Sequence, residues 1–417
     1  MPAKALNNPM TGSISHFLEE IASCSQKGQG VTRLPFTPEH KAASKVIEKW
    51  MLDAGLRVSV DHAGTIIGRR EGPYGAPTLL FGSHQDTVRN GGKFDGIMGV
   101  LLPILALGEL DSHEFGFSIE VLAFADEEGV RFPTALLGPR ALAGTLDPNT
   151  LKSRDEDGVM LAQAMTDYGL KPDALSELDR RNTPLLGYVE THIEQGPILE
   201  DMEQSLGVVS AISGIERFQV TLVGEAGHAG TVPMNLRHDT LVCAAEFVLA
   251  IETLAKSTAE LIVTVGKLVV LPNAVNVIPG RVTLTVEVRS ALDEIRQRAG
   301  DDILLLLDDI ATRRQIIYEF KKSYEQAASP CDPGLQGLLS DVVSDLTGKS
   351  PLLPSGATHD AAAMADLCPT AMLFVRCKNG VSHSPEEFAC EADMRLAVDA
   401  LKDLISKISV KLSSAFS

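Results

Sequence analysis

Residues 78–88 read Thr-Leu-Leu-Phe-Gly-Ser-His-Gln-Asp-Thr-Val, an apolar run that turns polar within a few positions. Such a short apolar run predicts a buried strand, with the polar residues at its carboxyl end. A second buried strand is predicted at Ser118–Ala125, ahead of Asp126–Glu128, and the apolar stretch Met98–Leu110 predicts a helix between the two strands. Strands that alternate with helices indicate an α/β domain built on a mostly parallel sheet. Open sheets of this class carry their sites at the carboxyl ends of the strands.

The pattern changes near residue 212, where the predicted elements follow the order β-α-β-β-α-β of a ferredoxin-like α+β module. These elements are Arg217–Leu222, Asp239–Lys256, Leu261–Val270, Arg281–Arg289, Leu292–Thr312 and Ile316–Phe320. A complete module in mid-chain implies an inserted lid domain at residues 212–329, with hinges at Gly207–Gly214 and Ser329–Pro330. Residues 1–211 and 330–417 then form the first domain.

Two helices are expected at the start of the first domain, over residues 14–27 and 38–55. The second helix has a clear start signal, because Thr37 can cap it and Pro38 suits its first position. Towards the C-terminus, the sequence predicts a helix at Leu335–Thr347, a strand at Thr370–Val375 and a helix at Glu391–Leu412.

Composition and charge argue against several kinds of partner. A chain of 417 residues exceeds one ordinary core, and 44% hydrophobic with 22% charged residues is a globular balance. The net charge of −18 and the aromatic content of 5% disfavour nucleic-acid binding. The negative charge favours solubility, and clustered carboxylates can also hold divalent cations.

The six cysteines are scattered and form no C-x-x-C pair, which is typical of thiols in a reducing compartment. The N-terminal residues lack an apolar signal core. No apolar run reaches the ~20 residues that span a bilayer. We therefore expect a cytoplasmic protein without a membrane partner.

Polar residues at the predicted strand ends suggest a metal site. His84 offers an imidazole, Asp86 can accept its second N–H, and Asp95 lies in a glycine-rich turn that permits close approach to a cation. Glu127 and Glu128 are adjacent carboxylates, so one can bind a cation while the other acts on water. Taken alone, each segment also fits a solvated loop or a helix start.

Two further segments add imidazoles. His192 alternates with Glu194 along an extended stretch, so both side chains are expected on one side. His383 lies in a loop after the last predicted strand. A single histidine is more often structural. Imidazoles and carboxylates at several strand ends of one domain, however, are enough to hold two divalent ions that share a carboxylate.

Together, these segments resemble the M20 metallopeptidase and amidohydrolase clan. Within it they are similar to the branch of N-carbamoyl-L-amino acid hydrolases, allantoate amidohydrolases and β-ureidopropionases, over residues 14–412. The motifs that carry the resemblance are G-S-H-x-D-T-V, N-G-G-x-x-D-G, D-E-E-G-x-R-F, T-H-I-E-Q-G-P, H-A-G-T-x-P-M, N-V-I-P and G-V-S-H-S-P. One departure is Thr358 in Ser355–Asp360, where the branch usually has glycine. It leaves the fine substrate assignment open.

The resemblance implies roles for these residues. Asp95 bridges two metal ions, with His84 and His192 on one ion and Glu128 and His383 on the other. Glu127 is then the general base. The two ions lower the pKa of a shared water and polarise the substrate carbonyl. Zinc, manganese, cobalt and nickel all suit this ligand set.

The resemblance also implies substrate contacts from the lid. His228 donates to the developing oxyanion, and Asn276 and Arg289 bind a substrate carboxylate. From the sequence pattern alone, Arg289 could equally form a surface ion pair, and His228 could be a surface residue at the end of a strand. Arg217 is a further candidate contact. In the first domain, Gln195 is expected to contact the ureido nitrogen, and His359 with Asp360 to form or support the pocket wall.

The expected reaction is hydrolysis of an N-carbamoyl-L-amino acid to the amino acid, carbon dioxide and ammonia. The alternatives are an allantoate amidohydrolase or a β-ureidopropionase, which need the same metals and a similar small carboxylate-bearing ureido substrate. A catalytically silent binding protein is disfavoured because the base and ligand positions are all filled. By resemblance, the lid is expected to pair two chains as a homodimer, and closure on its hinges would exclude water.

Overall fold

The chain divides into two units in the computed structural model, which describes residues 12–110 and 115–415. Unit 1 comprises the chain up to Ser210, then Cys331–Leu353, and the chain from Thr358 onwards. Unit 2 comprises Ala211–Pro330 together with the short segment Pro354–Ala357. Each unit has its own hydrophobic core.

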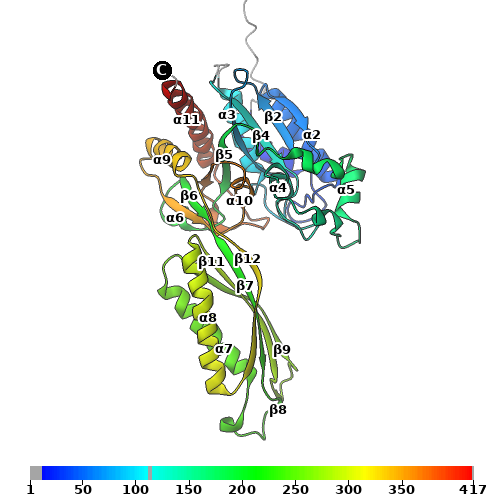
Figure 1. The fold of residues 1–417 in the computed structure, drawn as a ribbon, viewed down its shortest axis with the longest axis vertical. Helices are drawn as coiled ribbons and strands as arrows, with labels where there is room; N and C mark the ends of the chain where they lie inside the picture. The colour runs from blue at the N-terminus through cyan, green and yellow to red at the C-terminus, as the bar shows by residue number, and fades with distance from the viewer. Residues whose placement is uncertain (1–11, 111–114, 416–417) are drawn as a thin grey trace, which may run out of the picture. The chain divides into compact units, whose positions relative to one another are not determined.

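Unit 1 is built on a central sheet with strand order β1-β2-β4-β3-β5-β15-β6 (Figure 1). The strands are β1 (Arg57–Val60), β2 (Ile66–Arg70), β3 (Thr78–His84), β4 (Ser118–Phe124), β5 (Leu185–Ile193), β6 (Leu206–Ile212) and β15 (Thr370–Val375), and β14 (Leu352–Ser355) also pairs with β6. The four central strands β4, β3, β5 and β15 run parallel to one another. The expected α/β class with a mostly parallel sheet is confirmed.

Helices of unit 1 pack on this sheet and around it. They are α1 (Ile14–Ala22), α2 (Pro38–Asp53), α3 (Ile97–Glu109), α4 (Leu137–Leu142), α5 (Leu161–Tyr168), α6 (Ile198–Asp201), α9 (Pro333–Thr347), α10 (Asp360–Met364) and α11 (Glu391–Ala415). The predicted start of α2 is confirmed, since Thr37 accepts a hydrogen bond from the His40 amide and Pro38 is the first residue. The prediction that α1 reaches residue 27 is wrong. Ser23 turns back onto the Glu20 carbonyl, and the Gln26 amide then pairs with Thr32 in a loop.

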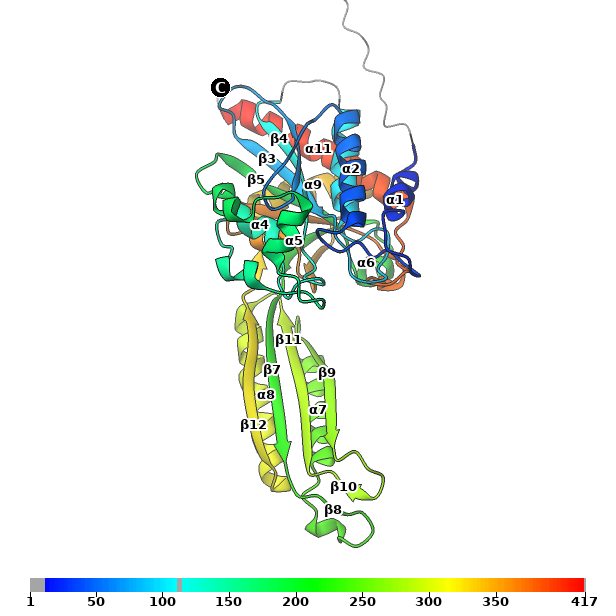
Figure 2. The same ribbon diagram turned by 90° about the vertical axis from the view of Figure 1, so that its right-hand side faces the viewer.

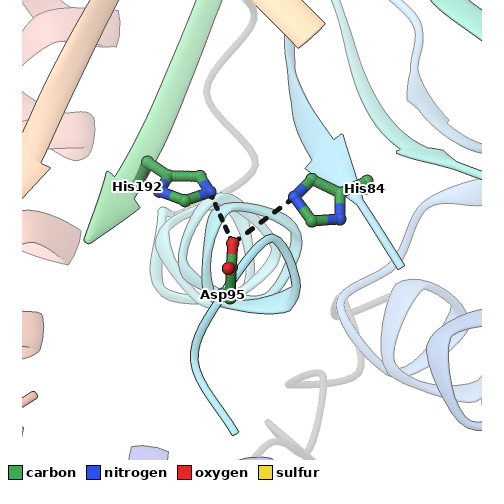
Figure 3. Close-up of side chains that lie close together, drawn as sticks. All are labelled: His84, Asp95 and His192. Carbon is green, nitrogen blue, oxygen red and sulfur yellow. Dashed lines mark ion pairs between the residues drawn. The ribbon is translucent and has the colours of Figure 1, made fainter. Parts of the chain in front are cut away.

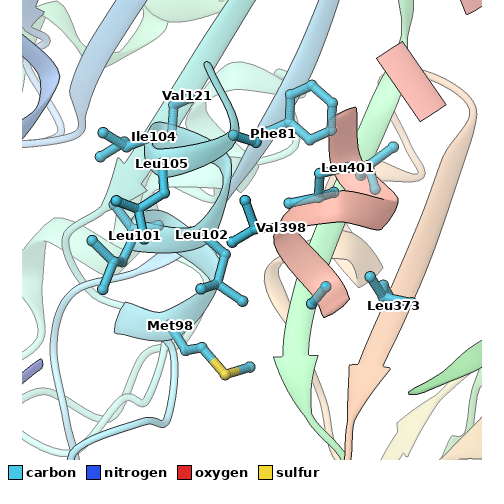
Figure 4. Packing of buried hydrophobic residues seen from close by; sticks show 14 of the residues in the cluster. Phe81, Met98, Leu101, Leu102, Ile104, Leu105, Val121, Leu373, Val398 and Leu401 are labelled. Atoms are coloured by element: carbon cyan, nitrogen blue, oxygen red, sulfur yellow. The ribbon is translucent and has the colours of Figure 1, made fainter. Parts of the chain in front are cut away.

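The core of unit 1 forms around α3, whose apolar residues are buried on all sides (Figure 4). Phe81 and Val121 of the sheet and Val398 of α11 belong to the same cluster. Gly99 lets α3 approach β5 closely, because a Cβ there would lie 2.2 Å from the Thr191 carbonyl oxygen. Packing α3 against the sheet fixes the loop at its N-terminus, which carries Asp95.

Unit 2 is a four-stranded antiparallel sheet of order β12-β7-β11-β9, with two helices on one face (Figures 1 and 2). In chain order, the elements are β7 (Gly214–Val223), α7 (Thr240–Ser257), β9 (Ile262–Leu271), β11 (Arg281–Ser290), α8 (Asp293–Arg314) and β12 (Ile317–Gln326). A small ribbon of β8 (Gly227–His228) and β10 (Val277–Ile278) extends from one end of this sheet. No helix among the described residues is both long and apolar enough to cross a membrane.

The buried face of α3 predicts a strong effect of truncation. Leu101 is fully buried, so Leu101→Ala is expected to lower the free energy of unfolding of unit 1 by about 2–5 kcal/mol. Leu52 is 60% exposed on α2, and Leu52→Ala is expected to change it by less than about 0.5 kcal/mol. Urea denaturation followed by the fluorescence of the single tryptophan, Trp50, measures both in unit 1. Equal losses in the two variants would contradict this packing.

Candidate metal centre

The parallel strands of unit 1 bring the predicted site residues to one edge of the sheet. His84 is the last residue of β3, and His192 is the next-to-last residue of β5. Glu127 and Glu128 follow β4, and His383 lies in the loop after β15. Because these four strands are parallel neighbours, their carboxyl ends meet, and segments far apart in sequence share one site.

The Asp95 carboxylate lies at the centre of this site. Its Oδ1 atom is 3.0 Å from His192 Nε2 and 3.5 Å from His84 Nε2 (Figure 3). Its Oδ2 atom is 3.2 Å from His383 Nε2, and His383 Nε2 is in turn 3.8 Å from Glu128 Oε1. The two oxygens of one carboxylate therefore face two different groups of nitrogen and oxygen atoms.

This arrangement fits two divalent cations. His84, Asp95 and His192 present ligand atoms within 4.8 Å of one another, and so do Asp95, Glu128 and His383. Glu128 Oε1 is buried and has no hydrogen-bond partner, which is costly for a carboxylate unless a cation is near. Imidazole with carboxylate suits zinc and the neighbouring first-row metals.

Hydrogen bonds to the second ring nitrogens orient the imidazoles. His84 Nδ1 lies 3.0 Å from the main-chain oxygen of Asp86, and His192 Nδ1 lies 2.9 Å from the main-chain oxygen of Ile193. A carbonyl partner requires a proton on Nδ1 and leaves Nε2 free to bind a metal. Asp86 is thus the partner of His84, as predicted, but through its main-chain oxygen, since its carboxylate is 3.7 Å away.

The Asp86 carboxylate instead fixes the acidic loop after β4. It accepts hydrogen bonds from the amides of Glu127, at 3.1 Å, and Glu128, at 3.2 Å. Gly96 completes the close fit, since a Cβ there would lie 2.4 Å from the His84 ring. The glycine next to Asp95 is thus required by the approach of an imidazole.

Burial and mutual repulsion raise the pKa values of Glu127 and Glu128. At Asp95 the hydrogen bonds from the three imidazoles outweigh the effect of burial and hold the pKa well below its ordinary value. Burial, followed by the charge of Asp95, raises the pKa of Glu128 to about 7. Burial also raises the pKa of Glu127 well above its ordinary value, with Glu128 and Asp360 adding to the effect. The hydrogen bond to Asp95 raises the pKa of His383 to about 9. The cluster without ions thus favours protons where cations would otherwise bind.

The remaining predicted residues of unit 1 surround this centre. Gln195 donates from Nε2 to Asp95 Oδ2 at 3.1 Å, while its own Oε1 is buried without a partner. The ring centroids of His359 and His192 are 4.4 Å apart. Asp360 is fully buried, and neither of its carboxylate oxygens has a hydrogen-bond partner. Glu194, two residues after His192, accepts the amide hydrogens at the start of α6.

The predicted substrate residues of unit 2 form two separate pairs. His228 lies on β8 opposite Val277, which places Asn276 beside it in the small ribbon. Arg289 and Arg217 lie on neighbouring strands of the main sheet and share the carboxylate of Glu287. Both guanidinium groups are therefore held by an acid within unit 2.

Sequence reasoning missed Glu387, which is buried and accepts the amide hydrogens of Phe94 and Asp95 at 3.0 Å. The signal was the Glu386–Glu387 pair after His383, but the sequence does not say which glutamate turns inwards. It also gave no reason for Gly92. A Cβ at that position would lie 2.2 Å from the Glu387 carboxylate.

Comparisons with known proteins find similar sequences and structures. Residues 80–407 match the model of peptidase family M20/M25/M40. The chain is 40% identical to the N-carbamoyl-L-amino acid amidohydrolase of Geobacillus stearothermophilus, covering 90% of this chain and 93% of the relative. It is 39% identical to a probable allantoate deiminase of Oryza sativa subsp. japonica, covering 95% and 88%. A hydantoinase/carbamoylase family amidase from Burkholderia multivorans has a similar structure, with a TM-score of 0.88, 31% identity and coverage of 94% and 96%.

The raised pKa of His383 predicts that metal binding releases protons. At pH 7.5, this imidazole is protonated in the metal-free protein, but an ion needs it neutral. On loading with Zn²⁺ we expect His383 to release about one proton. The number of protons released from His383 should decrease as the pH rises above its pKa of about 9. Calorimetric titration in two buffers of different ionisation enthalpy measures the number released. It is expected to drop in His383→Ala, and identical heats in both buffers would contradict the interpretation.

Proposed function

Because the chain belongs to peptidase family M20/M25/M40, we propose that it is a two-metal amidohydrolase acting on N-carbamoyl-L-amino acids. The products are the amino acid, carbon dioxide and ammonia. The observation that carries this proposal is the convergence of three imidazoles and a second carboxylate on Asp95, with Glu127 beside them. The relatives named N-carbamoyl-L-amino acid amidohydrolases support the substrate class. A cytoplasmic location remains part of the proposal.

In this proposal His84 and His192 would hold one ion, Glu128 and His383 would hold the other, and the Asp95 carboxylate would serve both. When bound, the ions supply positive charge that activates a water and polarises the substrate carbonyl. Zinc, manganese, cobalt and nickel are the candidates.

Glu127 serves as the general base. It lies within ligand distance of His84 and Glu128, yet it is not needed to complete either ligand group. Burial raises its pKa above the ordinary value, and a carboxylate with a raised pKa is a stronger base towards water. Glu127 passes that proton to the nitrogen that leaves as the C–N bond breaks. The Asp86 carboxylate accepts the amide hydrogen of Glu127 and so holds the Glu127 backbone in place during this proton transfer.

Arg289 is suited to bind the substrate carboxylate. Its Nε and Nη2 atoms contact Glu287 at 2.8 and 2.7 Å, and Nη1 donates to the Gly356 carbonyl. One N–H on each terminal nitrogen remains available, which is the pair that a carboxylate binds in a bidentate manner. Glu287 also receives Arg217, so we assign Arg217 to holding this clamp rather than to direct contact.

His228 and Asn276 cannot reach the same small substrate as Arg289 from one chain. Arg289 lies near the end of β11, whereas the ribbon with Asn276 precedes Arg281 at its start. Eight residues of extended strand separate these ends by roughly 27 Å. We therefore propose that one chain supplies Arg289 to a site and the partner of a homodimer supplies His228 and Asn276.

The two edges of the unit 2 sheet indicate which one pairs. Edge strand β9 exposes apolar side chains, among them Ile262, Leu268 and Leu271. The opposite edge strand β12 carries charged residues, including Lys321 and Glu325. Charges protect a free edge, whereas an apolar edge invites another strand. We accordingly place the dimer contact at β9.

Allantoate is a second candidate substrate, because relatives at 34–39% identity are named allantoate deiminases or amidohydrolases. It also carries a ureido group and a carboxylate. Gln195 contacts Asp95, and Thr358 directly precedes His359, whose ring packs against His192. These two positions are where selectivity between the two substrates would be sought.

The proposed base predicts the outcome of a conservative change. Glu127→Gln is expected to lower kcat on N-carbamoyl-L-amino acids by about 10²–10⁴-fold, because the amide cannot accept the proton. The measurement compares N-carbamoyl-L-amino acids, N-carbamoyl-β-alanine and allantoate as substrates, with metal content determined in parallel. The variant should retain its ions. Full turnover in Glu127→Gln, or inactivity of the native chain on all three compounds, would overturn the proposal.

Mixed dimers test the shared site. Chains with Glu127→Gln and chains with His228→Ala are each expected to be inactive alone. Co-expressed with different tags and purified through both, they should regain about half the native rate, since one site of the pair then has both an intact Glu127 and the partner's His228. A doubly tagged dimer without activity would show that His228 acts within its own chain. Failure to recover any doubly tagged species would contradict the dimer.

A further inference from the structure

Glu387 is a buried carboxylate that the proposed reaction does not use. It follows His383 in the same loop and is only 4% exposed. One of its oxygens, Oε1, accepts the amide hydrogens of both Phe94 and Asp95, each at 3.0 Å. The other oxygen, Oε2, accepts the Ser382 hydroxyl at 2.9 Å. A single side chain thus joins the backbone of the central aspartate to a loop 292 residues away.

The contacts continue from Ser382 to the Asp95 side chain. Ser382 Oγ is 3.3 Å from Asp95 Oδ2. Gln195 Nε2 donates to Ser382 Oγ at 3.0 Å and to Asp95 Oδ2 at 3.1 Å. Glu387, Ser382, Gln195 and Asp95 therefore form one closed hydrogen-bonded network. All of its side-chain contacts to Asp95 are to Oδ2, the oxygen that faces His383.

The two halves of the centre differ in how they are built. His84 and His192 belong to strands in the middle of the sheet, so the ladder hydrogen bonds of β3 and β5 hold them. His383 is 52% exposed, lies in a loop, and has a left-handed φ of 55°. For a residue other than glycine this conformation is strained, and it persists only where surrounding contacts fix it. The Ser382–Glu387 hydrogen bond lies directly beside it.

We propose that Glu387 is a positioning residue that sets the affinity of the ion held by Asp95 Oδ2, Glu128 and His383. It does so by fixing the Asp95 backbone and the His383 loop to each other, while the ion held by His84, His192 and Asp95 Oδ1 depends on the sheet. The inference rests on the proposed two-metal centre. It also explains Gly92, whose missing Cβ leaves room for the carboxylate.

Stepwise metal titration tests this role. Glu387→Gln keeps the shape of the side chain but replaces one acceptor oxygen with a donor, so it cannot accept both the amides and Ser382. We expect the first Co²⁺ to bind within about twofold of the native affinity and the second to bind about 10–100-fold more weakly. The visible absorption of Co²⁺ and chelator competition report each step. Excess metal should restore kcat in this variant.

Two further variants make the test specific. Glu386→Gln changes the neighbouring exposed glutamate and should bind both ions as the native chain does. Ser382→Ala keeps the contacts between Glu387 and the backbone and should also weaken the second ion selectively. Equal weakening of both ions in Glu387→Gln, or no change in either, would overturn the inference. If the native chain itself binds fewer than two ions, it is the two-metal proposal that fails.

Discussion

The Asp95 carboxylate is the contact on which the rest of the centre depends. Its oxygens face imidazoles on two sides, and these imidazoles come from three separate segments of the chain. The acids around it are buried close to one another, and this burial raises their pKa values. Burying charge is costly unless it is paired or hydrogen-bonded. A site built this way is stable with cations present, and without them it retains protons.

The fold limits this cost by fixing the acids through backbone amides. Asp86 accepts the amides of Glu127 and Glu128, and Glu387 accepts those of Phe94 and Asp95. In each case a carboxylate from one ligand-bearing loop holds the backbone of another. These contacts satisfy buried oxygens and at the same time set the distances between ligands. The parallel sheet supplies the remaining precision, because β3 and β5 place their imidazoles through ladder hydrogen bonds.

The sequence predicted the parts of this design that depend on local pattern. The apolar run before His84 gave its strand, Thr37 and Pro38 gave the start of α2, and repeated polar strand ends placed His192 and Glu128 at one edge of the sheet. The sequence did not predict the hydrogen-bond partners of individual polar atoms. The Asp86 carboxylate accepts the Glu127 amide, 41 residues along the chain, rather than the His84 imidazole. Glu194 accepts amides at the start of the neighbouring helix α6. Only the folded chain shows that Glu387, and not Glu386, is the buried neighbour of Asp95.

Unit 2 imposes a different constraint, which is its length. A single antiparallel sheet carries Arg289 at one end and the ribbon with His228 at the other, and strand geometry keeps them apart whatever the position of the unit. Under the proposed function, the groups that serve one small ureido acid are therefore assigned to two copies of the chain. An apolar β9 edge is a liability on a monomer but is appropriate in the proposed homodimer. The proposed homodimer thus gives the exposed edge and the divided substrate groups one explanation.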